Sequence, residues 1–227
     1  MTRRGALMSL FPFAIAALAA GCGVWFVIAP GVGPALSLAA VIYLVPPLAY
    51  RFHQRVCPQR ASAVRLVGEG YVPWWGLHQI ELLYEALPSL EAVLRLVPGL
   101  YSAWLRLWGS EIGQQVYWTP RVAIHDRGLL RVGDRVIFGD RATIYGHAIR
   151  RSRGNLLLIV KPVTIGAGAM VGGHSVIGPG ARIDEGTALE VGAWVFPTER
   201  VGAENPPVSA RELAACALER RARGGRL

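Results

Sequence analysis

Aliphatic residues return at every sixth position through the C-terminal part of this chain. They are Ile165, Val171, Ile177, Ile183, Leu189 and Val195. Small residues stand four positions after each of the first five, at Ala169, Ser175, Ala181, Thr187 and Ala193, and Glu199 ends the series. A shorter run has the same step, with Val132, Phe138 and Ile144 as aliphatic or aromatic members and Ala142 and Ala148 as small ones. A period of six matches neither a helix nor plain strand alternation, so the chain is expected to turn a corner once per repeat.

Three such repeats close one triangular coil, and stacked coils bury one continuous apolar column. Glycine follows the aliphatic position in several repeats, at Gly133, Gly139, Gly166, Gly172 and Gly178, where a larger side chain would clash at a corner. The pattern therefore predicts a three-sided prism over residues 111–202.

This pattern resembles the left-handed parallel β-helix of the hexapeptide-repeat acyltransferases, which is an exception to the usual right-handed crossover. The resemblance covers roughly residues 110–202. It implies transfer of an acyl group from acyl-CoA, with acetyl-CoA as the first choice. It also implies a homotrimer whose active sites lie between neighbouring prisms.

Two uncharged stretches, residues 6–28 and 29–50, precede the repeats, and Pro30, Gly31, Gly33 and Pro34 separate them. Each is about as long as the 20 residues that a helix needs to cross a bilayer. A secretory signal is the alternative for the first stretch, but a second apolar run follows it at once. We expect a transmembrane helical hairpin over residues 1–50. Arginines flank its outer ends, which places the catalytic part on the cytoplasmic face of a bacterial inner membrane.

The net charge of +9 comes almost entirely from arginine, since Lys161 is the only lysine among the 227 residues. The arginines gather at the N-terminus, after the second apolar stretch and near the C-terminus. This placement suits an anionic membrane surface as partner and does not predict nucleic-acid binding, because aromatic and basic residues do not alternate on a recognition module. Cys22, Cys57 and Cys216 are too few for a disulfide framework or a zinc knuckle.

Residues 51–110 carry tryptophans and leucines at helical spacing, with breaks at Pro88 and at Pro98-Gly99. We expect a neck of amphipathic helices that lies as a collar at the membrane interface, and packing against the first coil is the alternative. The segments 71–75 and 100–113 resemble the entry into the β-helix in membrane-bound C-terminal regions of some nonribosomal peptide synthetases. In the tail, residues 203–227, a short basic helix is expected, with Ser209 as N-cap and Glu212 in the capping-box position.

The repeat is interrupted once, between Ile144 and Ile165, by a segment that starts at His147. An excursion in the middle of a coil is typical of a functional insertion. The order of an aliphatic step, a histidine, a loop and Lys161-Pro162-Val163-Thr164-Ile165-Gly166 resembles the acetyltransferases of sugars, maltose and chloramphenicol, which implies that His147 is the catalytic base. An exposed turn histidine is the alternative. Asp126 is expected on the same edge, where it would orient the imidazole or only cap a turn.

His125 and His174 are also weighed as functional residues. His174 occupies the same place in its repeat as His147, and we expect it to be a corner residue that could line the donor pocket. Three histidines on such a prism also raise a zinc site of the γ-class carbonic anhydrase kind. Because the three are almost evenly spaced along the chain, no metal is predicted.

The resemblance assigns further residues to the donor. Gly172 and Gly173 match the segment along which the pantetheine arm passes, and Val191 and Phe196 match positions on later coils. Pro197 stands where the sugar enzymes have a lysine that holds the nucleotide phosphates. Arg150 is expected to contact these phosphates instead, with Arg151 and Arg153 beside it, or else these arginines contact anionic lipid.

The predicted fold is therefore an α+β membrane protein with a helical hairpin, an amphipathic neck and a left-handed β-helix. The predicted function is membrane-anchored acyl transfer from acyl-CoA to a hydroxyl or amine of a membrane-associated saccharide, lipid or peptide, with His147 as general base. The alternative is a non-catalytic trimeric scaffold that organises a biosynthetic complex at the membrane.

Overall fold

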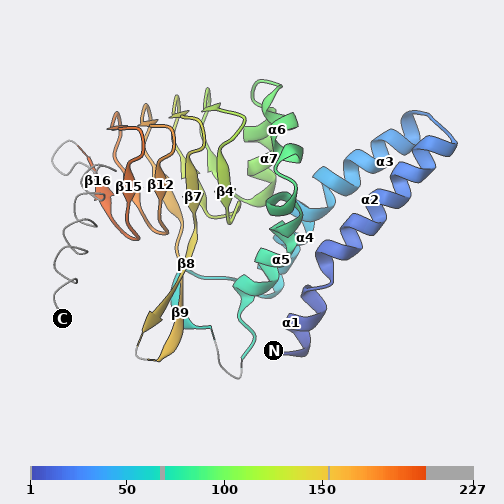
Figure 1. The fold of residues 1–227 in the computed structure, drawn as a ribbon, viewed down its shortest axis with the longest axis horizontal. Coiled ribbons are helices and arrows are strands. Elements are labelled where there is room, and N and C mark those ends of the chain that lie inside the picture. Colours follow the sequence, from blue (N-terminus) through green and yellow to red (C-terminus); the bar gives the residue numbers. More distant parts are fainter. Residues whose placement is uncertain (1, 67–69, 153, 203–227) are drawn as a thin grey trace, which may run out of the picture.

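Three parts of the molecule lie in a row in the computed structural model, which describes residues 2–66, 70–152 and 154–202 (Figure 1). A helical hairpin stands at one end, a layer of neck helices in the middle and a strand-built prism at the other end. The helices are α1 (Arg3–Met8), α2 (Phe11–Ile28), α3 (Val32–Tyr43), α4 (Val45–Val56), α5 (Pro73–Ala86), α6 (Ser89–Arg95) and α7 (Leu100–Trp108). The tail helix expected around Ser209 lies outside the described residues.

The N-terminal hairpin consists of two long apolar helical runs, Arg3–Ile28 and Val32–Val56. Both are long and apolar enough to cross a membrane, judged by length and composition alone. Each run is interrupted: α1 ends at Met8, before Pro12 of α2, and α3 ends at Tyr43, before Pro46 of α4. Proline lacks the N–H that would continue a helix, so it favours a break at these points. The second run extends beyond Tyr50, where the sequence interpretation ended it.

The helix α7 is amphipathic, whereas α5 is buried or half-buried along almost its whole length. The breaks between the neck helices fall at Pro88 and Pro98-Gly99 as expected. Trp74, Trp104 and Trp108 do not form a collar that faces outward, because all three are buried within the protein. Trp104 and Trp108 pack edge to face against each other at 5.4 Å between ring centres. The burial of these tryptophans agrees with the alternative interpretation, in which the neck packs against the first coil.

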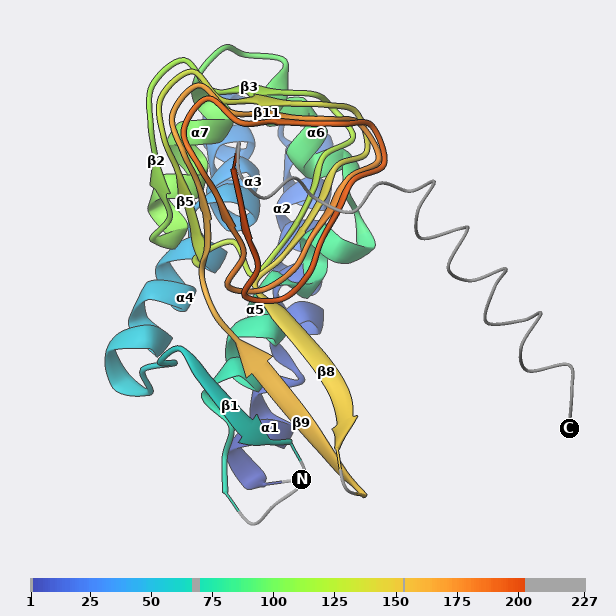
Figure 2. The same ribbon diagram turned by 90° about the vertical axis from the view of Figure 1, so that its left-hand side faces the viewer.

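The prism has three sides, and every side is a parallel sheet. The first side contains β2 (Glu111–Ile112), β5 (Leu130–Val132), β10 (Val163–Ile165), β13 (Arg182–Ile183) and β16 (Arg200–Val201). The second contains β3 (Tyr117–Trp118), β6 (Ile137–Phe138), β11 (Met170–Val171) and β14 (Ala188–Leu189). The third contains β4 (Ala123–His125), β7 (Thr143–Tyr145), β12 (Val176–Ile177) and β15 (Trp194–Val195). The coils are stacked as the six-residue repeat predicts (Figure 2).

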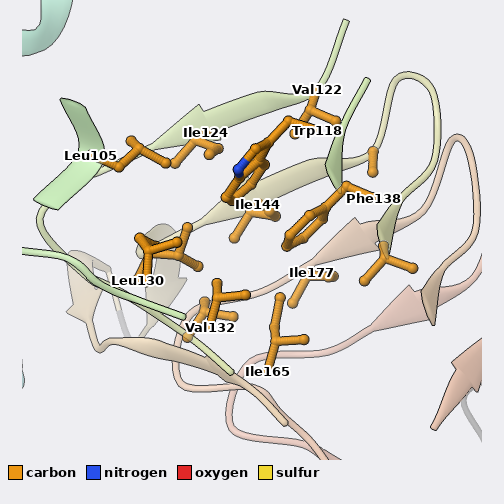
Figure 3. Close-up of a cluster of buried hydrophobic side chains, with 14 of the residues drawn as sticks. Leu105, Trp118, Val122, Ile124, Leu130, Val132, Phe138, Ile144, Ile165 and Ile177 are labelled. Carbon is orange, nitrogen blue, oxygen red and sulfur yellow. The ribbon is translucent and has the colours of Figure 1, made fainter. Parts of the chain in front are cut away.

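The repeated aliphatic residues fill the inside of the prism. Ile165, Val171 and Ile177 are buried, and in the first two coils Trp118 stacks on Phe138 at 4.3 Å between ring centres (Figure 3). The small residues at the corners are buried as well, except Thr187, which is half-buried. Such a column is a continuous hydrophobic core.

One corner position differs from the sequence interpretation. Ala148 was expected to be a small residue of the repeat, but it lies in β8 (His147–Ser152), opposite Ile159 of β9 (Asn155–Val160). The interruption is thus a two-stranded antiparallel hairpin that leaves the coil at Gly146 and returns at Lys161. The strand β1 (Ser62–Arg65) adds to the free edge of β9. Its partner is about 100 residues away in the chain, so local sequence pattern did not reveal this strand.

Glycines after the aliphatic positions allow the coils to lie close together. A Cβ added at Gly166 would lie 2.4 Å from the backbone nitrogen of Glu185 in the next coil. Gly186 has a left-handed backbone, φ +68°, and open space around it. Close backbone contact therefore requires glycine at position 166, whereas the left-handed backbone favours glycine at position 186.

We expect Gly166→Ala to lower the stability by more than about 3 kcal/mol, because backbone atoms of two coils would have to separate. Gly186→Ala should cost only about 1–2 kcal/mol, the cost of a left-handed alanine. Thermal unfolding of the two purified variants in detergent measures the difference. Equal losses would contradict the assigned packing.

Candidate functional site

The candidate site lies at the edge of the prism where the third side meets the first, here called the insertion edge. In the first coil this edge carries Asp126-Arg127-Gly128, which lengthens the step from Ile124 to Val132 to eight residues. In the second coil it carries the β8–β9 hairpin. Because the third-side strands β4 and β7 pair in register, the two insertions start directly beside each other.

Asp126 and His147 meet at this edge, as the sequence predicts. The His147 Nδ1 lies 2.6 Å from the Asp126 Oδ2, and Asp126 is 7% exposed. Gly146 permits this approach, because a Cβ there would lie 2.8 Å from the Asp126 Cβ. Within the part of the chain that the structure describes, the His147 Nε2 has no hydrogen-bond partner and is not among the buried unpartnered atoms.

Two aromatic residues of α5 complete the surroundings of this pair. The indole Nε1 of Trp74 donates to the Asp126 Oδ1 at 2.8 Å, so both carboxylate oxygens are engaged. The centre of the Trp74 ring lies 4.5 Å from that of His147, and the His78 ring stacks on Trp74 at 4.9 Å and lies 5.8 Å from the His147 ring. Sequence reasoning missed both residues. The sequence assigns the segment around Pro73-Trp74-Trp75 to the amphipathic neck and to the entry into the β-helix, and nothing local connects it with Asp126.

The surroundings of the His78 imidazole favour its neutral form, because its pKa is lowered. Burial lowers its pKa, the Asp126 carboxylate acts in the opposite direction, and the nearby His147 lowers the pKa further. A neutral ring can stack on Trp74 without bringing a second positive charge to His147.

A buried cluster of charges joins α5 and α6 to the insertion edge. Arg127 lies at its centre and pairs with Glu81 at 2.8 Å, with Glu91 at 2.5 Å and with Glu85 at 3.1 Å. Burial raises the pKa of Glu81, although the positive charge of Arg127 opposes this. The cluster holds α5, with its Trp74 and His78, against the coil that carries Asp126.

His125 lies outside the pair of Asp126 and His147. Its Nδ1 is 2.8 Å from Glu85, and its ring stacks on Tyr145 at 4.5 Å. The pKa of Glu85 is lowered overall, because the bond to His125 and the charge of Arg127 outweigh the effect of burial. Among the described residues, no three His, Cys, Asp or Glu side chains form a group that could hold a metal ion.

The residues expected to bind the donor are distributed over two edges. Gly172, Gly173 and Val191 lie where the second side meets the third, here called the donor edge, and the Gly192 N–H donates to the Gly173 carbonyl at 2.8 Å. His174 is also on this edge, with φ +58°, so it does not stack over His147. Phe196 is on the insertion edge of the fourth coil.

Arg150 is exposed on β8, three positions from His147, so its side chain belongs to the opposite face of the strand. One chain therefore brings Asp126 and His147 together and does not bring Gly172, Gly173, Val191 or Arg150 to them.

Loss of the central arginine should reveal the cluster's contribution. We expect Arg127→Met to cost about 3–5 kcal/mol, because Glu81 and Glu91 would be left buried without a positive partner. The matched control is Arg121→Met, whose pair with Asp140 is exposed and should be worth about 1 kcal/mol or less. Thermal unfolding in detergent compares the two, and a control as unstable as Arg127→Met would rule out the assignment.

No protein-family model and no curated protein matches the chain. Among solved structures, it is similar to a hexapeptide-repeat containing acetyltransferase from Vibrio cholerae in complex with acetyl coenzyme A. The identity is 21%, the match covers 56% of this chain and 87% of that one, and the TM-score is 0.37. A maltose O-acetyltransferase from Clostridium difficile is 16% identical, with coverages of 52% and 76% and a TM-score of 0.36. A galactoside acetyltransferase in complex with coenzyme A is also 16% identical, with coverages of 50% and 75% and a TM-score of 0.34.

Proposed function

We propose that the protein is a membrane-attached acyltransferase. It transfers an acyl group, with acetyl as the first choice, from acyl-CoA to a hydroxyl or amine of a membrane-associated saccharide, lipid or peptide. The contact that carries the proposal is the 2.6 Å pair of His147 and Asp126 at the point where the hairpin leaves the prism. A histidine oriented by a buried carboxylate is the arrangement that general-base chemistry needs.

The chemistry follows from the two ring nitrogens of His147. Its Nδ1–H donates to Asp126, which leaves Nε2 with a lone pair to accept a proton. The acceptor's O–H or N–H gives its proton to Nε2 while its oxygen or nitrogen attacks the thioester carbonyl. The tetrahedral intermediate then collapses, the C–S bond breaks, and the CoA sulfur leaves and takes the proton. Trp74 keeps Asp126 in place throughout.

The donor and the base would come from different copies of the chain. His147 is on the insertion edge, whereas Gly172, Gly173 and Val191 are on the donor edge, across the whole third side. Two prisms packed side by side would bring the insertion edge of one to the donor edge of the next. Exposed apolar residues of the second side, Tyr117, Ile137 and Met170, pair in one column and support such association. Such a contact joins two different edges and is therefore heterologous, and a ring of three copies, as in the trimer that the resemblance implies, would close it.

Membrane attachment rests on the hairpin, and orientation rests on the arginines. The exposed Arg3 and Arg4 stand at the start of the first apolar run, and Arg51 and Arg55 stand near the end of the second. We propose that these ends and the prism lie on the cytoplasmic side of a bacterial inner membrane, where acyl-CoA is available.

A trimeric scaffold without activity is the second candidate. It is favoured by Pro197, which stands where the sugar enzymes have their phosphate-binding lysine. Titration with coenzyme A separates the two candidates, since an enzyme shows saturable binding and a scaffold shows none.

Acyl transfer by the purified full-length protein tests the assigned base. We expect His147→Ala to lower kcat by about 10²–10⁴-fold, the usual contribution of a positioned general base. Asp126→Asn should also lower kcat by a large factor, because the amide would not hold His147 in the tautomer that leaves Nε2 free to accept a proton. The control is Asp134→Asn, a corner aspartate of the same prism that only accepts from the Gln114 N–H. Full activity of His147→Ala would disprove the assignment.

Mixed oligomers test whether each site uses two copies. Val191 is 73% exposed, so Val191→Asp should fold and repel the donor phosphates. When the inactive Val191→Asp and His147→Ala chains are mixed at random, one contact in four joins an intact insertion edge to an intact donor edge. About a quarter of the wild-type sites should therefore be restored. A site built within one chain would regain nothing.

A further inference from the structure

We infer that the N-terminal hairpin enters one leaflet of the membrane and turns back inside it, in place of crossing the bilayer. This inference rests on the proposed membrane attachment and concerns its geometry. Three features of the structure support it. They are the contacts that attach the hairpin to the neck helices, the length of the part that lacks such contacts, and the change of direction between α3 and α4.

The second arm of the hairpin is fastened at the C-terminal end of α3. The Tyr43 hydroxyl donates to the Leu90 carbonyl of α6 at 2.9 Å. The Trp104 indole of α7 donates to the Tyr43 carbonyl at 2.9 Å, and the Tyr84 hydroxyl of α5 donates to the Ile42 carbonyl. The neck helices therefore reach the level of Tyr43.

The first arm is fastened through α1 and the beginning of α2. Both contact α5, Ile15 is 3% exposed, and the Trp75 indole of α5 donates to the Ser9 hydroxyl at 3.3 Å. Lipid cannot surround these parts, because α5 also carries Glu81 and Glu85 into the charge cluster beside the prism.

Only the distal part of the hairpin stands free, and it projects away from the neck layer on the side opposite the prism (Figure 1). The helix α3 has 12 residues, which at 1.5 Å per residue gives about 18 Å. The hydrocarbon core is about 30 Å thick, so a free arm of at most this length ends near the middle of the bilayer and does not reach the far side. The free part has no charged residue and exposes large apolar side chains to the lipid, among them Leu18, Val24, Val27, Ile28, Val32 and Leu36.

The helix α4 does not lengthen this arm. It starts after the break at Leu44 and runs in a different direction from α3 (Figure 2). Its buried side, Pro46, Pro47 and Tyr50, faces the protein. Leu48 and Phe52 are exposed next to Arg51 and Arg55, which is typical of a helix at the level of the lipid headgroups.

This geometry brings the candidate site to the membrane surface. His147 contacts Trp74 of α5, and α5 is the helix on which α1 and α2 rest. An acceptor anchored in the same leaflet could extend its polar part past α5 to His147, which favours a lipid or lipid-linked acceptor among the three proposed.

Depth measurements along the hairpin test the inference. In the full chain with Cys22, Cys57 and Cys216 changed to serine, single cysteines at Leu18, Gly31 and Phe52 are spin-labelled and reconstituted into phosphatidylethanolamine–phosphatidylglycerol liposomes. Gly31 has an extended backbone and open space, so it accepts a side chain. Accessibility to oxygen and to a water-soluble nickel complex gives the depth of each label.

A hairpin within one leaflet should place the label at Gly31 deepest, at Leu18 shallower and at Phe52 among the headgroups. A spanning hairpin reverses the first two: Leu18 would lie near the bilayer centre, and Gly31 would be exposed to the nickel complex on the far side. That result would overturn the inference and leave membrane attachment intact. If the protein does not float with the liposomes, membrane attachment itself is wrong. Retained thermal stability of each labelled variant serves as the control for folding.

Discussion

The stacking of each coil directly on the one below is the constraint on which the rest of the structure depends. Parallel pairing in register means that equivalent positions in successive coils lie a strand spacing apart, about 4.8 Å. An insertion at one edge is therefore held next to an insertion at the same edge of the neighbouring coil. The contact between Asp126 and His147, 21 residues apart, is a direct result. The prism is rigid because its column of apolar side chains leaves no space for one coil to rotate against the next.

The buried charges serve a different purpose from the apolar column. Arg127 and its three glutamates contribute little net stability relative to an apolar cluster, because each charge loses its hydration. They do restrict the geometry, since a displaced α5 would leave an unpaired charge inside the protein. Arg127 follows Asp126 in the chain, and Glu81 lies two turns of α5 after Trp74. The same helix that neutralises Arg127 therefore also supplies the hydrogen bond to Asp126.

The neck connects the apolar hairpin to the candidate site. One side of α5 supports α1, α2 and α4, and its start contacts the candidate base. Tryptophans that would suit a membrane interface are used here to bind helices to each other and to the first coil. In the proposed function, attachment to the membrane depends instead on the exposed apolar arms and the basic ends of the hairpin.

The sequence by itself determined the prism, its apolar column, the apolar hairpin and the helical neck, because each has a periodicity set by local backbone geometry. It also determined that Asp126 and His147 share an edge, since counting residues per coil is enough for this. Only the tertiary structure decided the rest. Trp74 and His78 reach the site through the packing of a helix more than 40 residues earlier in the chain, and β1 pairs with β9 across about 100 residues. Ala148 stands at the position that the six-residue repeat assigns to a small residue, but it belongs to the β8–β9 hairpin and not to the prism. The spacing alone does not show where the chain leaves the coil. Contacts between residues this far apart in the chain depend on which surfaces of the folded coils the other elements bury. A local sequence pattern does not predict them.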